Sequence, residues 1–590
     1  MIIAGTPATI RTLLLLGAAF TLPCSAVAAT YWVAPNGAAV WASCRSASPM
    51  AGASACSLAT ANAGVSPGDT VYLRGGIYNT HIFPRLSGSD AANRITYAAH
   101  GTEIPVINNT GTIYATYYHG IALIGRSYIK VSGVTVSMNG GRLMMITNGA
   151  SYNEIVNCTL DGNGGFSTIQ MWDGDSTDVG VQPSVTHNWI HGCTIKNTGK
   201  VDATCDDTGG MQLGVPGHDK DSNYNTIENN TFFSGGHHNL ETFTKYNVIR
   251  GNFFHFEGSM APPVGGCLFG LDSNGLYGNR NLQIYDGYGE DKFNLIEQNR
   301  FGTSGPPPDD DGGDGLTITA ARNLIRYNAI YNSQNNGVMF KSGYLSLADN
   351  NRFVNNTVYK VGRYRNTAAN WQGWGFRWYG SYARAGNVIK NNIFFMHGGT
   401  ADFGGGSAMI YSDNVVASNS CTEARAGACA VVGDPKFINP DVTDPASATL
   451  PNLGLQSSSP AIDAGTNLTQ AVGAGGTSRT LVVQDAMYFQ DGTWGSDLAR
   501  GVTFFPDWIA IGTVSNVVQI SGVNYATNTI TLASPISWAD GAKIWLYKKS
   551  DGAVVLAGAA PDIGASEFGT NSASPLSGVI PPTGLRTTVH

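Results

Sequence analysis

One short pattern recurs between residues 150 and 400, and it limits the fold more than any other feature of the sequence. An asparagine is followed by a branched apolar residue or Phe two positions later, and by a second asparagine five positions later. Six copies fit this pattern fully, and they begin at Asn225, Asn247, Asn294, Asn323, Asn351 and Asn387. Two degenerate copies begin at Asn153 and Asn188, where Cys158 and Cys193 replace the second asparagine. A slot that accepts Asn or Cys indicates a column of small side chains stacked through successive repeats.

The spacing within each copy predicts how the repeats fold. Alternation with a period of two indicates short strands, and the Gly, Asn and Asp between copies indicate turns. Repeats of 22 to 47 residues with so few strands cannot bury their own apolar face and must stack on their neighbours. Stacked asparagines can then bond from coil to coil. We therefore predict an all-β, right-handed parallel β-helix rather than a β-propeller, whose blades are more uniform and antiparallel.

Composition agrees with a solenoid and excludes other classes. Among 590 residues there are 75 glycines, and 13% of positions are charged while 42% are hydrophobic. Ample apolar content argues against disorder, and the glycines lack the period of collagen. The net charge of −7, without a basic cluster, disfavours nucleic acid and anionic membranes as partners.

The first 29 residues are typical of a cleaved signal peptide. Arg11 precedes an apolar stretch of about ten residues, followed by a run of small residues up to Ala29. This stretch is too short to span a bilayer, and no later segment is long enough. We expect a secreted protein, extracellular or periplasmic, with no membrane partner and with a monomer favoured over oligomers.

Eight cysteines remain when Cys24 is removed with the signal peptide. An even number in an exported chain indicates disulfides, and zinc is disfavoured because no C-x2-C pair exists. Cys158 and Cys267 are predicted to be unpaired and buried. The predicted local pairs are Cys44/Cys56, Cys193/Cys205 and Cys421/Cys429.

Five segments outside the repeats resemble the right-handed β-helix proteins of the pectate-lyase-like superfamily. Residues 31–37 and 67–76 look like its opening strand and N-terminal cap, and residues 433–437, 459–465 and 561–565 look like its closing coils. The resemblance implies the β-helix fold. It leaves the activity open, since the superfamily includes lyases, hydrolases, epimerases and binding proteins.

The same segments divide the chain. We predict a signal peptide at 1–29, a β-helix with an N-terminal cap at 30–465, and an inserted β-rich module at 466–560, where apolar and polar residues alternate. A closing β-helix motif at 561–568 and a flexible tail at 569–590 complete the chain.

Lys341 and Arg377 are the first candidate catalytic residues. Their order resembles the β-helix lyases related to chondroitinase B and alginate lyase, in which a Lys base and an Arg one coil later share the chemistry. The spacing of 36 residues requires an insertion near Trp371 and Trp374. β-Elimination on a uronate needs its carboxylate neutralised, a base for the α-proton and a proton for the leaving oxygen. The alternative is that both are ordinary solvated cations.

A histidine cluster is the second candidate. His237, His238 and Glu241 are followed by His255 in the next repeat, where stacking would bring all four together as acids, bases or metal ligands. The alternative is a hydrogen-bonded histidine ladder within a turn.

An acidic run is the candidate metal site. Asp309, Asp310, Asp311 and Asp314 place four carboxylates within six positions, and oxygen ligands suit Ca²⁺. The alternative is a solvated acidic turn.

Aromatic residues near Arg377 are candidates for substrate binding, since aromatic faces stack on sugar rings. They are Trp371, Trp374, Trp378 and Tyr379. The alternative is a loop packed by its own aromatics.

Together these features predict a secreted enzyme that cleaves an acidic, uronate-containing polysaccharide, with β-elimination as the favoured chemistry. A non-catalytic glycan-binding or cell-surface β-helix protein, and a glycoside hydrolase on the same fold, stay as alternatives.

Overall fold

A computed structural model describes most of the chain. The described residues are 29–109, 112–114, 117–138, 140–162, 167–172, 184–198, 210–214, 222–233, 235, 238–255, 280–285, 291–302, 313–333, 335–342, 348–362, 373–380, 386–395, 403–404, 409–416, 429–440, 450–495 and 505–570. The predicted signal peptide and tail therefore lie outside the described residues, apart from Ala29, Gly569 and Thr570.

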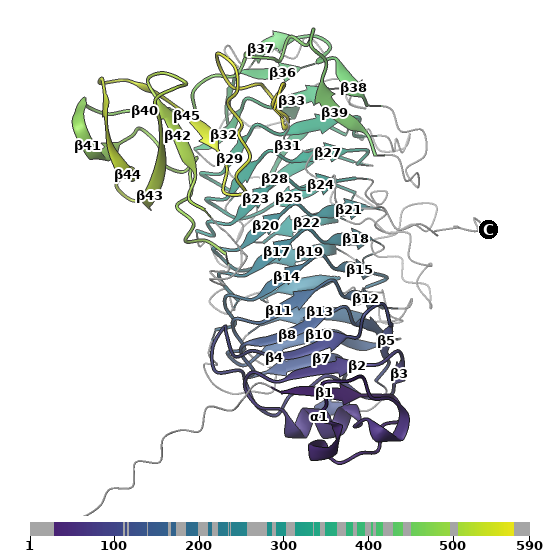
Figure 1. Cartoon of the computed structure of the whole chain (residues 1–590). Helices are drawn as coiled ribbons and strands as arrows, with labels where there is room; N and C mark the ends of the chain where they lie inside the picture. The colour runs from purple at the N-terminus through teal and green to yellow at the C-terminus, as the bar shows by residue number, and fades with distance from the viewer. Residues whose placement is uncertain are drawn as a thin grey trace, which may run out of the picture.

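Three long sheets run side by side along the molecule, and each coil adds a strand to them (Figure 1). Sheet A contains, in spatial order, β1 (Thr30–Val33), β2 (Thr70–Leu73), β4 (Ile95–Ala99), β8 (Ile129–Ser132), β11 (Glu154–Val156), β14 (Trp189–His191), β17 (Thr226–Glu228), β20 (Val248–Arg250), β23 (Leu295–Glu297), β26 (Leu324–Arg326), β29 (Arg352–Val354), β32 (Asn387–Lys390) and β35 (Met409–Ser412). Sheet B contains β3 (Gly76–Tyr78), β5 (Pro105–Ile107), β9 (Thr135–Ser137), β12 (Thr159–Asp161), β15 (Thr194–Lys196), β18 (Thr231–Phe233), β21 (Phe253–His255), β24 (Arg300–Phe301), β27 (Ala329–Tyr331), β30 (Thr357–Tyr359), β33 (Ile393–Phe395), β36 (Asn414–Val416) and β37 (Cys429–Val432).

Sheet C is the third side of the solenoid. It contains β6 (Thr112–Tyr114), β7 (Tyr117–Ile124), β10 (Gly141–Thr147), β13 (Ser167–Met171), β16 (Met211–Leu213), β19 (His238–Thr242), β22 (Arg280–Ile284), β25 (Leu316–Ile318), β28 (Val338–Ser342), β31 (Phe376–Gly380) and β34 (Phe403–Gly404). Within these three sheets the strand pairs are parallel, except for β6 with β7. The predicted right-handed parallel β-helix is confirmed.

The repeated asparagines form two buried ladders inside the coils. In the first ladder the backbone N–H of each asparagine donates to the side-chain oxygen of the next, as from Asn323 to Asn351 at 2.8 Å. In the second ladder Cys158 and Cys193 continue the column, because the Cys193 N–H donates to the Asn230 carboxamide at 2.9 Å. The predicted column that accepts either Asn or Cys is confirmed.

The corner between sheets A and B explains part of the glycine and asparagine content. One residue turns the chain there, directly before each member of the second ladder, and it adopts positive φ. Asn and Gly enter this left-handed region most easily. The corner residues are Asn157, Gly192, Asn229, Gly251, Gln298, Tyr327, Asn355, Asn391 and Asp413.

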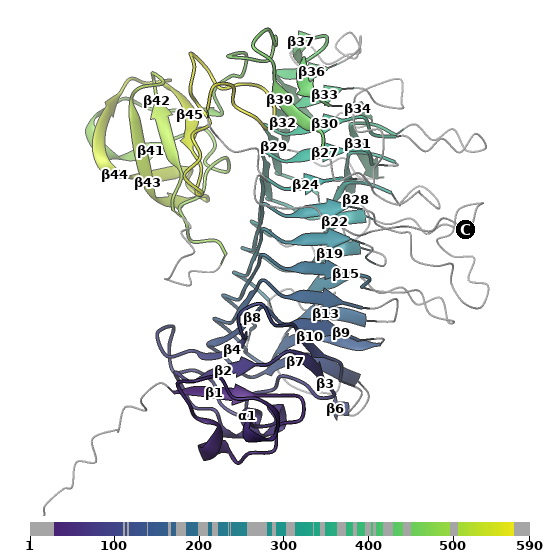
Figure 2. The ribbon, with the colours of Figure 1, turned by 45° about the vertical axis from the view of Figure 1, so that its right-hand side comes forward.

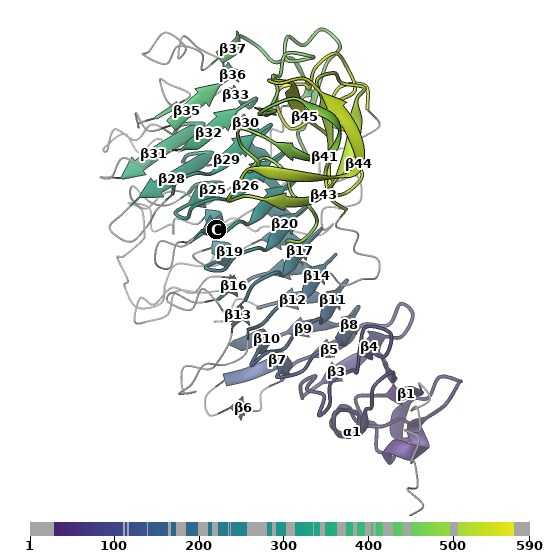
Figure 3. The ribbon, with the colours of Figure 1, turned by 90° about the vertical axis from the view of Figure 1, so that its left-hand side faces the viewer.

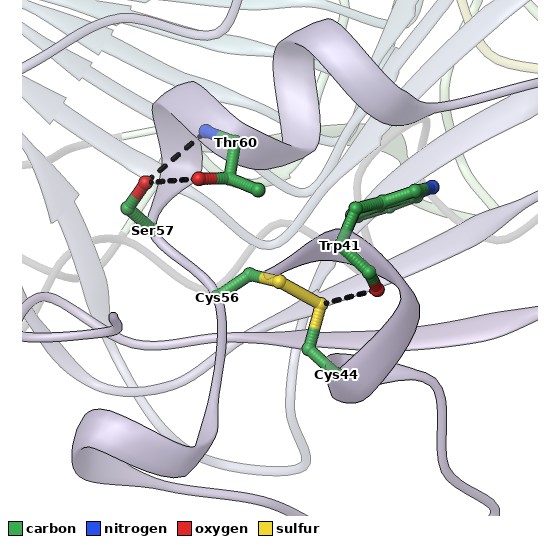
Figure 4. The surroundings of a disulfide bond; sticks show 5 residues. All are labelled: Trp41, Cys44, Cys56, Ser57 and Thr60. Carbon is green, nitrogen blue, oxygen red and sulfur yellow. Dashed lines mark hydrogen bonds between the residues drawn. A yellow bond between two sulfur atoms is a disulfide. The ribbon is translucent and has the colours of Figure 1, made fainter. Parts of the chain in front are cut away.

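The N-terminal cap closes the apolar end of the solenoid. It contains the 3-10 helices η1 (Trp41–Cys44) and η2 (Gly52–Ser54) and helix α1 (Leu58–Gly64), whose N-terminus is capped by the Ser57 side chain. The predicted disulfide between Cys44 and Cys56 ties η1 to the start of α1 (Figure 4). None of the described helices is long and apolar enough to cross a membrane.

The other cysteine predictions have mixed outcomes. The predicted pair of Cys193 with Cys205 is wrong, because Cys193 is a free, buried member of the second ladder. Cys158 is free and buried as predicted. Cys429 is disulfide-bonded, while Cys205, Cys267 and Cys421 lie outside the described residues.

An antiparallel module packs on the outer face of sheet A, beside β29 and β32 (Figures 1, 2 and 3). Its sheet contains, in spatial order, β40 (Thr469–Gln470), β45 (Lys543–Lys548), β42 (Trp508–Ile511), β43 (Val517–Asn524), β44 (Thr529–Trp538) and β41 (Gly475–Val482). A hairpin of β38 (Phe437–Asn439) and β39 (Asn452–Leu455) covers the outer face of sheet B near β27 and β30.

Candidate functional site

The outer face of sheet C carries a row of mostly polar residues. Alternate residues of its strands, such as Leu240, Leu282 and Leu316, belong to the core, so the residues between them face outward. The outward row, in register from strand to strand, is Gln170, Gln212, Glu241, Gln283, Thr317, Met339 and Arg377. The module and the hairpin pack on parts of sheets A and B, and not on this row. The middle of the row, from Glu241 to Met339, is buried, whereas Gln170, Gln212 and Arg377 are half-buried.

Lys341 and Arg377 meet at the end of this row. Lys341 lies on β28 directly opposite Tyr379 on the adjacent strand β31. The Lys341 Nζ is 5.6 Å from the Tyr379 ring centroid, and the Arg377 guanidinium carbon is 5.0 Å from the same centroid. The guanidinium also lies 4.9 Å from the Trp374 ring centroid. Two cations that are 36 residues apart in sequence thus share one phenol ring, and all four side chains are half-buried.

The buried carboxyl group of Asp314 is linked to this cluster through Asn336. Asp314 accepts hydrogen bonds from the Asn336 backbone at 3.1 Å and side chain at 2.8 Å, and the Asn336 carboxamide accepts one from the Trp374 N–H at 3.1 Å. Burial raises the pKa of Asp314 to about 6, while Arg280, Asn336 and Arg377 oppose that shift. Asp314 therefore fixes the backbone that presents Trp374 to Arg377.

His238 and Glu241 lie on the same face but farther along the solenoid. The His238 Nε2 is 2.6 Å from the Gln283 Oε1 and 3.3 Å from the Arg280 Nη1, and the His238 Nδ1 is 3.3 Å from a Glu241 carboxylate oxygen. Strand β19 is three strands from β28, which corresponds to about 14 Å at ordinary strand spacing. These residues share a face with Lys341 and do not touch it.

Two predicted site residues lie elsewhere. His255 is on sheet B, stacked on Phe253 at 4.4 Å between centroids, and burial lowers its pKa to about 3. The expectation that it would join His238 is wrong, because the two occupy different sides of the coil. Trp378 belongs to the hydrophobic core and is 8% exposed, so its ring is not offered to a sugar.

The predicted calcium site is only partly described. Of the four predicted ligands only Asp314 is described: it is buried, and its two carboxylate oxygens accept hydrogen bonds from Asn336 and from the Thr317 hydroxyl at 3.2 Å. Within the described residues no group of three or more His, Cys, Asp or Glu could hold a metal ion. The remaining predicted site residues, His237, Trp371, Asp309, Asp310 and Asp311, lie outside the described residues.

Three members of the face were not predicted, namely Arg280, Gln283 and Asn336. Arg280 and Gln283 lie on β22, and Asn336 lies just before β28. Their roles depend on contacts with residues 22 to 45 positions away in the sequence. The alternation of Asn281, Leu282, Gln283 and Ile284 is the only signal in the sequence that could have placed Gln283 on the outer face.

The comparisons with known proteins concern the fold and not the activity. No family model and no curated protein matches the sequence. Solved structures similar to this chain include a xylose complex of XylC, with 11% identity, coverage of 70% of this chain and 88% of that chain, and a TM-score of 0.42. Pectate lyase Pel9A has 15% identity, coverage of 76% and 94%, and a TM-score of 0.39. The alginate lyase AlyGC has 15% identity, coverage of 64% and 52%, and a TM-score of 0.42. Similarity at this distance carries no argument about activity, which rests on the site.

Proposed function

We propose that the protein cleaves a uronate-containing polysaccharide by β-elimination on the outer face of sheet C. The observation that carries the proposal is the convergence of Lys341 and Arg377 on the ring of Tyr379. Two cations and a phenol within one half-buried cluster supply a carboxylate ligand, a base and an acid, which are the three groups that the reaction needs.

Each group takes one role. Arg377 binds the uronate carboxylate and withdraws charge from it, which makes the α-proton at C5 more acidic. Lys341, in its neutral form, accepts that proton, and the electrons of the C5–H bond form the C4–C5 double bond. The C4–O4 bond breaks, and the Tyr379 hydroxyl gives its proton to the leaving oxygen. Water then returns the proton from the Lys341 ammonium to the Tyr379 phenolate.

The outward row of sheet C extends away from this cluster. It runs from Gln170 to Arg377 across six strand spacings, about 29 Å. The residues in the middle of the row, from Glu241 to Met339, are buried. We therefore place the contact with the polymer at the half-buried cluster of Lys341, Arg377 and Tyr379.

Two further predictions belong to this proposal. Export through the predicted signal peptide would bring the protein to polysaccharides outside the cell. A calcium ion held near Asp309, Asp310 and Asp311 would supply extra positive charge for an anionic polymer.

A substrate panel tests the proposal. The mature protein is incubated with alginate, pectate, chondroitin and glucuronan, each with calcium and with a chelator, and the unsaturated uronate product is followed by its ultraviolet absorbance. We expect product from at least one polymer. The proposal fails if none of the polymers yields an unsaturated product. Saturable binding of a polymer without any product would instead identify a glycan-binding protein. Saturated reducing ends would identify a hydrolase.

A further inference from the structure

A cavity lies on another side of the solenoid, away from sheet C. It has a volume of about 620 Å³, and its walls come from five segments: β24 and the residues just before it, β27, hairpin β38–β39, the end of the module, and residues 565–570. Cavities of this size at junctions between structural units are typical of small-molecule sites. Its position separates it from Lys341 and Arg377, which it does not include.

The wall of this cavity carries a positive charge, on Arg300, that no described carboxylate pairs with. Arg300 lines it, is 6% exposed, and forms no ion pair within the described part of the chain. Its Nη2 donates to the Pro451 carbonyl, whereas its Nε has no hydrogen-bond partner. A buried guanidinium without a counter-charge is costly, so the site favours a bound anion.

The other ionisable groups in the wall do not neutralise Arg300. Lys549 and Asp551 face each other at 3.8 Å and balance one another. Burial, together with the nearby Asp562, raises the pKa of Glu567 to about 8, so this carboxyl group is mostly protonated at neutral pH. The cavity therefore keeps one net positive charge near pH 7.

The rest of the wall suits a sugar. Gln298 and Asn452 offer amides for hydroxyl groups, and Phe568, which is 42% exposed, offers an aromatic surface. We propose that the cavity is a non-catalytic site for the uronate end of an oligosaccharide, with Arg300 pairing with the carboxylate. The choice of a uronate rests on the proposed function, whereas the need for an anion rests on Arg300.

Calorimetric titration of the full mature protein tests the site without turnover. The probes are galacturonate, mannuronate and glucuronate, with galactose, mannose and glucose as neutral counterparts. We expect at least one uronate to bind at least tenfold more tightly than its neutral counterpart, because a charge-assisted pair is lost in the latter. Arg300→Gln should weaken this binding at least tenfold, while Arg85→Gln, at an exposed position near the N-terminal cap, should leave it within about twofold.

A second variant guards against a folding defect in Arg300→Gln. Phe568→Ala changes an exposed side chain and should weaken uronate binding about fivefold without changing the melting temperature. The inference is overturned if Arg300→Gln and Phe568→Ala both bind uronates as the wild type does, or if no uronate binds. It stands apart from the proposed function, because Arg300-dependent binding can persist in a protein that cleaves no polymer.

Discussion

At the scale of single residues, the ladder asparagines connect successive coils through buried side-chain hydrogen bonds. Asn328 accepts bonds from the Asn299 backbone and side chain, and donates to the Ile296 carbonyl and the Asn356 carboxamide, all between 2.9 and 3.0 Å. Removing this side chain leaves several buried polar groups without partners, each costing about 1–3 kcal/mol.

A series at position 328 tests this view. We expect Asn328→Ala to melt well below the wild type and Asn328→Cys to melt between the two, because Cys193 accepts a ladder hydrogen bond at the equivalent position. Exposed Asn439→Ala serves as the matched control and should melt with the wild type. Equal melting of the alanine and cysteine variants would show that the slot selects size alone.

Asp314 gives a second residue-scale prediction, which concerns pH. Its pKa is raised to about 6 in the folded protein, so between pH 4 and 6 the folded state binds more protons than the unfolded state, and stability falls as pH rises. The shift corresponds to roughly 2–3 kcal/mol lost across that range. Asp314→Asn keeps the acceptor for Asn336 and removes the titration.

Melting curves at pH 4, 5, 6 and 7 check this prediction. The melting temperature of Asp314→Asn should rise relative to that of the wild type as the pH rises through 6. Arg280 and Arg377 face position 314 in both proteins. An identical pH dependence in both proteins would contradict a titrating, buried Asp314.

At the scale of elements, the module is fixed to sheet A by buried charge. Arg326 bonds to Glu297 on the neighbouring strand at 2.9 Å and to Asp507 of the module at 2.7 Å, and all three side chains are fully buried. Leu295 and Leu324 add apolar contacts with the module beside them. Removal of one partner from such a cluster costs about 3–5 kcal/mol, because charges stay buried without compensation.

We therefore expect Arg326→Leu to loosen the module. Tryptophan fluorescence reports on unfolding of the module, since Trp494 and Trp545 are buried in it. The midpoint of urea unfolding should fall clearly below that of the wild type. Lys543→Ala, at an exposed position of the module, should leave the midpoint unchanged. A midpoint unchanged by Arg326→Leu would mean that apolar packing alone holds the module.

Elements also explain which predictions from sequence succeed. The ladders predict the fold because similar residues repeat in successive coils. Lys341 and Arg377 lie close together because they occupy the adjacent strands β28 and β31, while their catalytic roles stay a prediction. His255 and Trp378 could not be placed, because a residue's side of the coil and its inward or outward direction depend on where each short strand begins. One residue of register moves a side chain from the surface to the core.

At the scale of the whole molecule, the three sides of the solenoid differ in what covers them. The module covers part of sheet A and the hairpin part of sheet B, which leaves sheet C as the long described face with polar residues in register. A protein with a net charge of −7 thus places Arg280, Lys341 and Arg377 along one face. Such a local arrangement can attract an anionic polymer to an acidic protein.

The central claim is that Lys341 and Arg377 act together on a uronate. The most direct measurement is the rate of unsaturated product formation by Lys341→Ala on the best substrate of the panel. Its matched control is Lys548→Ala, since the Lys548 ammonium lies 5.4 Å from the Trp508 ring in the module, remote from sheet C. We predict that Lys341→Ala loses at least a hundredfold in rate, as general-base catalysis contributes about 10²–10⁴-fold, and that Lys548→Ala keeps the wild-type rate. A Lys341→Ala protein that forms product as fast as the Lys548→Ala control would contradict the account.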